Sequence, residues 1–520
     1  MRHVRVPLGR VQFLLVAALV VSVGASTSCG RPAPPQPTPS AVTLRFGVAL
    51  PKTPEASAGI RAFVNNLFSE SLVGTSWDGY PFARLAAEWT WKDNGLTLEL
   101  RIRDNLRFHD GTPVDNTFVR NTLLQVFKNP NSVSYQSVAG VEAIENNSVA
   151  IRLSRPEALL LSDLSNATIS MGTPDKDDVG LGPYRLLERG AKTRLAAFDS
   201  YYRGKPQIDA IEILEFEEQR TSWAALMRGQ IDAVHEILPS ALEFLQVKGQ
   251  SNARTFPFTR PYFIYLLFNV KHPILKSAQV RQALSYAVDR QAIVDRGLDR
   301  QGSLADGPIW PAHWAYGTTQ KAYTHNVEAA TARLDAAGLA MRRGRDDGRM
   351  PSRFRFKCLT IAKNATFEKI ALLLQKQLYE IGIDMDVEAV SLQELGARAA
   401  SGNFDVILAE RTSGRSLVWT YLFFHSKKFG GAYTAADTVL DKLRATSTEA
   451  AVRATVSDLQ QIFHDDPPGI FIAWPTVARV VSTKFIVPDE EGPDVSGGSD
   501  IVPGRDIIGS ISRWRAADRP

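Results

Sequence analysis

The C-terminal half of the chain alternates between strand-like and helix-like patterns. Residues 353–361 and 383–390 alternate apolar and polar side chains, and residues 404–409 are almost continuously apolar. Between these segments, "ATFEKIALLLQKQLYEIG" and "SLQELGARAASG" carry apolar residues at helical spacing. The order strand, helix, strand, helix, strand predicts parallel βαβ units and therefore an α/β fold.

Further elements follow from the same patterns. "TSWAALMRG" predicts a short helix that ends at Gly229, and the next residues, "QIDAV", predict a strand. Residues 280–295 predict one amphipathic helix. Cys358 lies inside the alternating segment 353–361, so we expect a buried thiol.

A His109–Asp110 pair follows the alternating strand "LTLELRI", and such pairs occur in metal sites and catalytic dyads. Asp110-Gly111 is a turn signal. After it, Thr112 as N-cap, Pro113 and Asp115 predict the start of a helix that continues to Phe127. We therefore expect a strand–turn–helix corner in which His109 hydrogen-bonds locally, rather than a site of chemistry.

Composition places the chain among soluble globular proteins of two or three domains. It has 520 residues, of which 44% are hydrophobic and 22% are charged. The net charge is +5, with no run of like charges, so we do not expect a nucleic-acid partner.

The N-terminus predicts a signal peptide over residues 1–28. Arg2, Arg5 and Arg10 form a basic region, and residues 11–23 carry no charge. A membrane-spanning helix needs about 20 apolar residues, which is longer than this segment. No second long apolar run follows.

The small residues that end at Cys29 resemble the lipobox of bacterial lipoproteins, in which the cysteine is lipidated. Ser26 stands where lipoboxes usually carry leucine, so ordinary cleavage near residues 25–27 stays open. Residues 30–40 are rich in proline and predict a stiff tether. These features together predict a domain held at the outer side of a membrane.

Motifs for catalysis or metal binding are incomplete. His235-Glu236 begins like a zinc-protease motif, but Pro239 stands where the second histidine is required. Residues 175–180 loosely suggest a calcium loop, yet Leu186 occupies the position of the bidentate glutamate. The sequence shows no nucleophile elbow, P-loop or Cys/His cluster. We therefore expect no enzyme, no cofactor and no metal site.

Several segments in a fixed order resemble the family 5 extracytoplasmic solute-binding proteins of ABC transporters, the peptide/nickel-binding type. The resemblance covers roughly residues 43 to 485. It is carried by residues 84–114 ("RLAAEWTWKDNGLTLELRIRDNLRFHDGTPV"), 180–189 ("GLGPYRLLER"), 201–213, 228–234, 266–290 ("LLFNVKHPILKSAQVRQALSYAVDR"), 307–316 ("GPIWPAHWAY") and 335–339.

The resemblance implies a two-lobe, type II periplasmic-binding-protein fold with an extra subdomain on the first lobe. The chain would cross between lobes near residues 260–269 and 474–483. The implied parts are the signal peptide (1–28), lipidated cysteine and tether (29–40), lobe I (41–260, with the subdomain at about 57–170), lobe II (261–474) and a return to lobe I (475–520).

The implied function is capture of a small solute between the lobes for delivery to membrane permease subunits. Peptides are the default ligand class, with other small solutes possible, and a metal-only ligand is disfavoured because the eight histidines are scattered. The family implies a monomer in the periplasm or on the outer face of the membrane, here lipid-anchored. A ligand-sensing receptor of the same fold, not coupled to transport, is the alternative.

The segment "FDVILAERTSGRSLVWTYLFFHS" departs from the peptide-binding members. Glu410-Arg411 stand where a Gly-Trp pair is expected, and Gly414, followed by Arg415, stands near the position of the aspartate that binds a peptide's α-amino group. Arginine fits a carboxylate or phosphate. We therefore expect an anionic or amine-blocked ligand; alternatively, both arginines are solvated loop residues.

Other candidate ligand contacts are aromatic or lie near the N-terminus. Trp419 and Tyr421 follow in the same predicted loop, and Trp310 lies with Trp314 in a segment that could face the cleft. Glu70-Ser71 lie where the family's N-terminal segment meets the cleft. Core packing is the alternative for each aromatic residue.

Overall fold

The computed structural model describes residues 41–49, 61, 63–130, 132–171, 179–237, 252–317, 322–341, 352–429, 431–488 and 506–518. The predicted signal peptide, Cys29 and the proline-rich tether lie outside these ranges. Among the described residues, no helix is long and apolar enough to cross a membrane.

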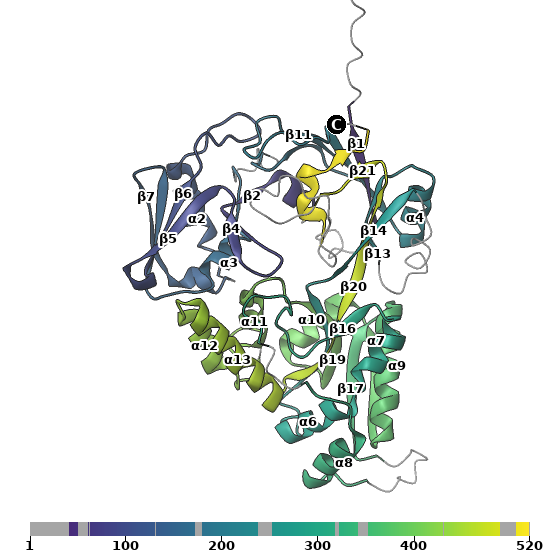
Figure 1. Ribbon diagram of the computed structural model, residues 1–520. Coiled ribbons are helices and arrows are strands. Elements are labelled where there is room, and N and C mark those ends of the chain that lie inside the picture. Colours follow the sequence, from purple (N-terminus) through teal and green to yellow (C-terminus); the bar gives the residue numbers. More distant parts are fainter. Residues whose placement is uncertain are drawn as a thin grey trace, which may run out of the picture. The chain divides into compact units, whose positions relative to one another are not determined.

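One mixed sheet of 12 strands organises the described chain (Figure 1). Its first half is β10, β11, β12, β1 and β13, with β14, and its second half is β15, β19, β17 and β18, with β16. The bounds are β10 (Tyr184–Glu188), β11 (Lys192–Ala197), β12 (Ala210–Phe216), β1 (Thr43–Ala49), β13 (Ala233–Ile237), β14 (Ala253–Thr259), β15 (Tyr262–Phe268), β16 (Gly302–Leu304), β17 (Phe354–Ile361), β18 (Ile383–Val390) and β19 (Val406–Thr412).

Two segments join the halves. Strand β20 (Gly469–Ser482) pairs with β15 and β16 through its first residues and with β13 and β14 through its last. The second connection is the short link between β14 and β15, where the backbone N–H of Arg260 donates to the carbonyl of Pro475, 2.9 Å away. The two connections therefore lie side by side.

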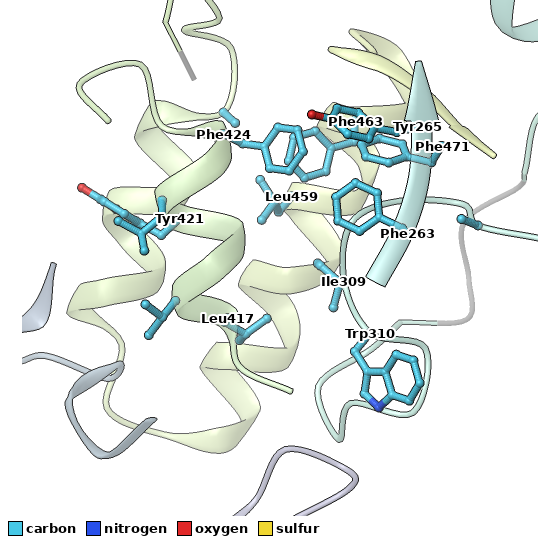
Figure 2. Packing of buried hydrophobic residues seen from close by; sticks show 14 of the residues in the cluster. Phe263, Tyr265, Ile309, Trp310, Leu417, Tyr421, Phe424, Leu459, Phe463 and Phe471 are labelled. Atoms are coloured by element: carbon cyan, nitrogen blue, oxygen red, sulfur yellow. The ribbon is translucent and has the colours of Figure 1, made fainter. Parts of the chain in front are cut away.

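Helices cover both faces of the second half. One face packs against α6 (Ala278–Ala287), α7 (Arg290–Gly297), α8 (Val327–Ala336) and α9 (Ala365–Glu380). The other packs against α10 (Leu392–Ser401), α11 (Leu417–Phe424), α12 (Asp437–Ala445) and α13 (Glu449–Asp465). Figure 2 shows rings of Phe263, Phe424, Phe463 and Phe471 meeting between strand and helices on this second face.

A separate four-stranded sheet, called the small sheet below, forms between β1 and β10 in the sequence. Its spatial order is β5-β6-β8-β7, and helix α2 packs against it (Figure 1). The bounds are β5 (Ala86–Lys92), β6 (Thr97–Ile102), α2 (Asn116–Val126), β7 (Val138–Ile144) and β8 (Ser148–Leu153). In β6, Leu98, Leu100 and Ile102 are buried, as the alternation predicts, but Leu96, which was predicted on the same face, precedes the strand and is exposed.

Shorter elements complete the described chain. In the first half, helix α4 (Gln219–Met227) packs on β1 and β13, and Gly229 follows it in the left-handed region. The others are β2 (Glu70–Ser71), β3 (Val73–Thr75), β4 (Pro81–Ala83), η1 (Asp93–Gly95), η2 (Ser134–Ser137), α3 (Leu160–Leu164), β9 (Thr168–Ile169), β21 (Phe485–Ile486), η4 (Ile508–Arg513) and β22 (Arg515–Ala516).

The predicted βαβ units are confirmed, since β17 pairs in parallel with both β18 and β19. Cys358 is buried in β17, and burial raises the pKa of its thiol to about 12. The single helix predicted over 280–295 is wrong. Val288 is extended there, and Asp289 starts α7 by accepting a hydrogen bond from the backbone of Ala292.

Two smaller predictions are also wrong. The N-cap of α2 is Asp115 rather than Thr112, because the Asp115 side chain accepts from the backbone N–H of Phe118, while Thr112 belongs to the preceding turn. The segment that contains Trp419 and Tyr421 is helix α11, not a loop, with Ser416 as its N-cap.

Candidate functional site

The end of strand β19 and the turn after it carry the predicted ligand-binding charges. The backbone N–H groups of Ser413 and Gly414 both donate to the carbonyl of Pro261, at 2.8 and 3.2 Å, so the turn is held against the link between β14 and β15. Gly414 has φ of +54°, in the left-handed region. The turn therefore lies where the two halves of the large sheet meet.

Arg411 is a partly exposed arginine whose orientation is fixed. Its Nε–H donates to the hydroxyl of Tyr265 at 2.8 Å, and its guanidinium lies 4.4 Å from the ring centroid of Phe423. Within the described residues, its two terminal nitrogens, Nη1 and Nη2, make no hydrogen bond. The edge of the guanidinium formed by Nη1 and Nη2, which is suited to pair with a carboxylate, is therefore not used by any described residue.

Gly414 packs directly against the indole of Trp419. A Cβ at position 414 would lie 2.5 Å from Cδ1 and 2.7 Å from Nε1 of this ring. A side chain at position 414 and the indole of Trp419 would therefore occupy the same space. The indole can lie where it does because residue 414 is a glycine and not an aspartate.

Arg415 and Trp310 contact a hairpin from the N-terminal part of the chain, between β3 and β4. The guanidinium of Arg415 lies 5.6 Å from the ring centroid of Trp77 in this hairpin. The indole N–H of Trp310 donates to the carbonyl of Trp77 at 3.0 Å, and the two rings meet edge to face. The backbone N–H of Trp314 donates to the carbonyl of Asp78 at 2.8 Å. The hairpin therefore packs against the loop that carries Trp310, at the end of the cluster in Figure 2.

The other predicted contacts are engaged within the protein. Glu70 is buried, with its carboxylate 2.5 Å from Nη1 of Arg84 and 2.8 Å from the hydroxyl of Tyr201. The hydroxyl of Ser71 donates to the carbonyl of Val73. Tyr421 is buried, and its hydroxyl donates to Asp441 and accepts from Arg444. The structure thus brings together Arg411, Trp419 and Gly414, which are linked through Phe423 and the Trp419 indole. Glu410 points from the opposite face of β19 and pairs with Arg260, while Arg415 and Trp310 lie against Trp77. The remaining predicted contacts lie in separate networks: Glu70, Ser71 and Tyr421.

Charges that the sequence did not single out lie beside Glu410. The guanidinium of Arg260 lies 3.4 Å from the carboxylate of Glu410 in the second half and 3.6 Å from that of Glu236 in the first half. Burial lowers the pKa of Arg260, but the two carboxylates outweigh it and the net shift is upward. No local pattern could have found this set, because its members are brought together only by the crossing strands.

The His109–Asp110 corner is structural, but His109 does not bond locally as predicted. Its Nε2 lies 3.0 Å from the carbonyl of Gly182, and its Nδ1 accepts from the backbone N–H of Gly180 at 3.3 Å. Burial lowers the pKa of His109, which favours the neutral ring that these two contacts require. Among the described residues, no group of three or more His, Cys, Asp or Glu side chains is placed to hold a metal ion.

Comparison with known proteins identifies the family. The profile of the bacterial extracellular solute-binding proteins, family 5 (middle region), matches residues 81–431. This chain belongs to the family 5 solute-binding proteins of ABC transporters. The dipeptide-binding protein of Escherichia coli K12 is 25% identical over 444 residues, which cover 76% of this chain and 81% of that protein.

Solved structures show the same fold. The oligopeptide-binding protein AppA of Bacillus subtilis, in complex with a nonapeptide, superposes with a TM-score of 0.72 at 21% identity, covering 92% of this chain and 100% of that one. The AgaA protein of A. tumefaciens R10, in complex with agropinic acid, gives a TM-score of 0.71 at 21% identity, covering 92% and 99%. The family 5 protein described here therefore has the two-lobe, type II periplasmic-binding-protein fold.

Proposed function

We propose that this family 5 protein captures a small anionic solute between its two lobes and delivers it to permease subunits in the membrane. The lobes are residues 41–260 with 475–520, and residues 261–474, with a subdomain at about 57–170. Two adjacent connections, the link around Arg260 and strand β20, allow one lobe to rotate on the other. A solute that contacts both lobes stabilises the closed form.

The observation that carries the anionic class is the geometry of Arg411. Its guanidinium is oriented by Tyr265 and Phe423, and its terminal nitrogens bond no described residue. Glu410, the adjacent carboxylate in the sequence, points from the opposite face of β19, and Arg260 lies 3.4 Å from it and partly neutralises it. A carboxylate on a peptide or peptide-like solute, with its amine blocked or absent, satisfies this site best.

Calorimetric titration with two blocked dipeptides tests the class of solute. N-acetyl-Ala-Ala carries a carboxylate and no amine, whereas Ala-Ala amide carries an amine and no carboxylate. We expect the first to bind and the second not to bind, and we expect Arg411→Gln to weaken the first by about 10- to 100-fold, because hydrogen bonds to charged groups contribute about 1.5–3 kcal/mol. Binding of the amide that survives Arg411→Gln would contradict the proposal.

Delivery to a permease is tested in cells. Uptake of the labelled solute should be lost when this protein is deleted and should return when it is supplied on a plasmid. A protein that binds the solute while uptake is unchanged by the deletion would instead be a sensor of the same fold.

We also propose that residues 1–28 are a signal peptide and that Cys29 carries the lipid anchor, which places a monomeric protein in the periplasm or on the outer face of the membrane. Metabolic labelling with radioactive palmitate should mark the protein and should be abolished by Cys29→Ser. Stable anchoring needs two acyl chains, and Cys29→Ser removes the residue that would carry them. The variant should therefore move from the membrane to the soluble fraction. Light scattering of the soluble variant should give the mass of one chain.

A further inference from the structure

Three aromatic rings lie beside Arg411, two of them partly buried on helix α11 and one exposed just after it. Trp419 and Phe423 are four residues apart and lie on one face of the helix, with ring centroids 5.7 Å apart and planes 26° apart. Phe429, which follows the helix, lies 6.2 Å from Phe423 and is 69% exposed. These three residues are called the ring platform below. The other six residues of α11 are buried.

The ring platform and the free arginine edge are contiguous. The guanidinium of Arg411 lies 4.4 Å from the centroid of Phe423, the central ring of the platform. The indole N–H of Trp419 donates to no group in the described part of the chain, so a hydrogen-bond donor is available beside the rings. A positive charge, a donor and an apolar surface therefore adjoin one another at the end of β19.

The turn at Gly414 packs against the platform. Because a Cβ at position 414 would overlap the indole of Trp419, the ring occupies the space of a side chain that would point from this turn. The indole in this position offers an apolar face and an N–H donor, in place of a carboxylate that would form an ion pair with an ammonium group.

We propose that the ring platform is a subsite for a planar apolar group of the solute, so that the protein selects small acids in which a carboxylate is joined to an aromatic ring. This inference rests on the proposed function. The carboxylate pairs with Nη1 and Nη2 of Arg411, and the ring stacks on Trp419, Phe423 or Phe429. The ring platform then determines specificity, while Arg411 supplies charge recognition.

Calorimetric titration of the full-length protein with three probes separates the two contributions. N-acetyl-phenylalanine has a carboxylate and a ring, N-acetyl-alanine has the carboxylate alone, and N-acetyl-phenylalaninamide has the ring alone. We expect N-acetyl-phenylalanine to bind about tenfold more tightly than N-acetyl-alanine, because ring burial adds apolar contact. The amide should bind more weakly than N-acetyl-phenylalanine.

Variants of the ring platform test which residues cause the preference for N-acetyl-phenylalanine over N-acetyl-alanine. Phe423→Leu keeps an apolar side chain but removes the ring, and Phe429→Ala removes a ring that is 69% exposed. Both should lower the preference for N-acetyl-phenylalanine to less than about threefold, and Phe429→Ala, which does not contact Arg411, should leave the affinity for N-acetyl-alanine unchanged. Tyr379→Leu, at an exposed ring on α9, is the matched control and should leave the preference intact.

Three results would overturn the inference or the function beneath it. Equal affinity for both carboxylates, with Arg411→Gln weakening both, overturns the ring platform and leaves the anionic function standing. A ring preference that persists in Phe423→Leu, Phe429→Ala and Trp419→Leu places the ring elsewhere and also overturns the platform. Binding of the uncharged amide as tightly as N-acetyl-phenylalanine, unaffected by Arg411→Gln, contradicts the anionic function itself.

Discussion

The guanidinium of Arg444 on helix α12 lies 2.5 Å from the carboxylate of Glu157, which follows the small sheet. Both side chains are almost fully buried. Arg444 also donates to the carbonyl of Val133 and the hydroxyl of Ser137, and its own carbonyl accepts from the backbone N–H of Ala158. The pair therefore joins helix α12, which packs on the second half of the large sheet, to the segment that follows the small sheet.

Removing one member of this pair should destabilise the protein strongly. Arg444→Met leaves the carboxylate of Glu157 buried without its partner, and we expect the free energy of unfolding in urea to fall by about 3–5 kcal/mol. Arg444→Met combined with Glu157→Leu should recover most of that loss, because no buried charge remains. Arg152→Met is the control, since the Arg152–Glu142 pair is exposed, and it should change stability little.

The hairpin that carries Trp77 should depend on Gly79. This residue has φ of +85°, and a Cβ there would lie 2.4 Å from the ring of His313 and 2.9 Å from the carbonyl of Arg415. Gly79→Ala should therefore lower the melting temperature and change tryptophan fluorescence. Gly111→Ala is matched, since Gly111 has φ of +86° with no atom within 4 Å of a Cβ, and it should cost only about 1–2 kcal/mol. Equal losses in the two variants would show that the hairpin contact is unimportant.

Acid should loosen the same contact through His313. Burial, together with the nearby Arg453, lowers the pKa of His313 to about 4, although Asp78 opposes the shift. The unfolded chain takes up this proton below a pKa of about 6.5, so stability falls as the pH falls from about 6.5 to about 4, by about 3 kcal/mol in total. Only the wild type should lose this stability, so the difference in unfolding free energy between the wild type and His313→Asn should change by that amount across this range. Parallel curves would contradict the assignment.

The thiol of Cys358 should be unreactive in the folded protein. It is fully buried, and the pKa of about 12 leaves almost no thiolate at neutral pH. In the Cys358→Ala and Cys29→Ser variants, a thiol reagent such as Ellman's reagent identifies each cysteine separately. We expect Cys358 to react only after addition of urea. Rapid reaction in buffer would mean that β17 opens readily.

An aspartate at position 414 should conflict with Trp419. Gly414→Asp alone should lower stability, because its Cβ overlaps the indole. Gly414→Asp with Trp419→Ala removes the overlap, so stability should recover, and the new carboxylate should favour peptides with a free α-amino group. Titration of Ala-Ala amide into both variants measures this change. A gain of amine binding by Gly414→Asp alone would show that the indole moves freely.

The sequence by itself determined the elements whose signals are local. Strand β18 was predicted with its observed bounds, and Gly229, which was predicted to end a helix, follows α4 in the left-handed region. Alternation and C-capping depend on residues that are close in the chain. Helix α11 was missed for a related reason. It is apolar on nearly every face, so it shows no helical periodicity. Its faces are buried by residues of other elements, which are distant in the sequence.

Only the tertiary structure decided which charged groups meet. Glu157 and Arg444 are 287 residues apart, His109 bonds residues more than 70 positions away, and Arg260 lies between Glu236 and Glu410 because two strands cross there. The family resemblance predicted Arg411 and Gly414 as candidate site residues. The orientation of the Arg411 guanidinium and the position of the indole against Gly414 depend on tertiary packing. Contacts of this kind depend on how distant segments are brought together in three dimensions, and no local pattern of residues encodes them.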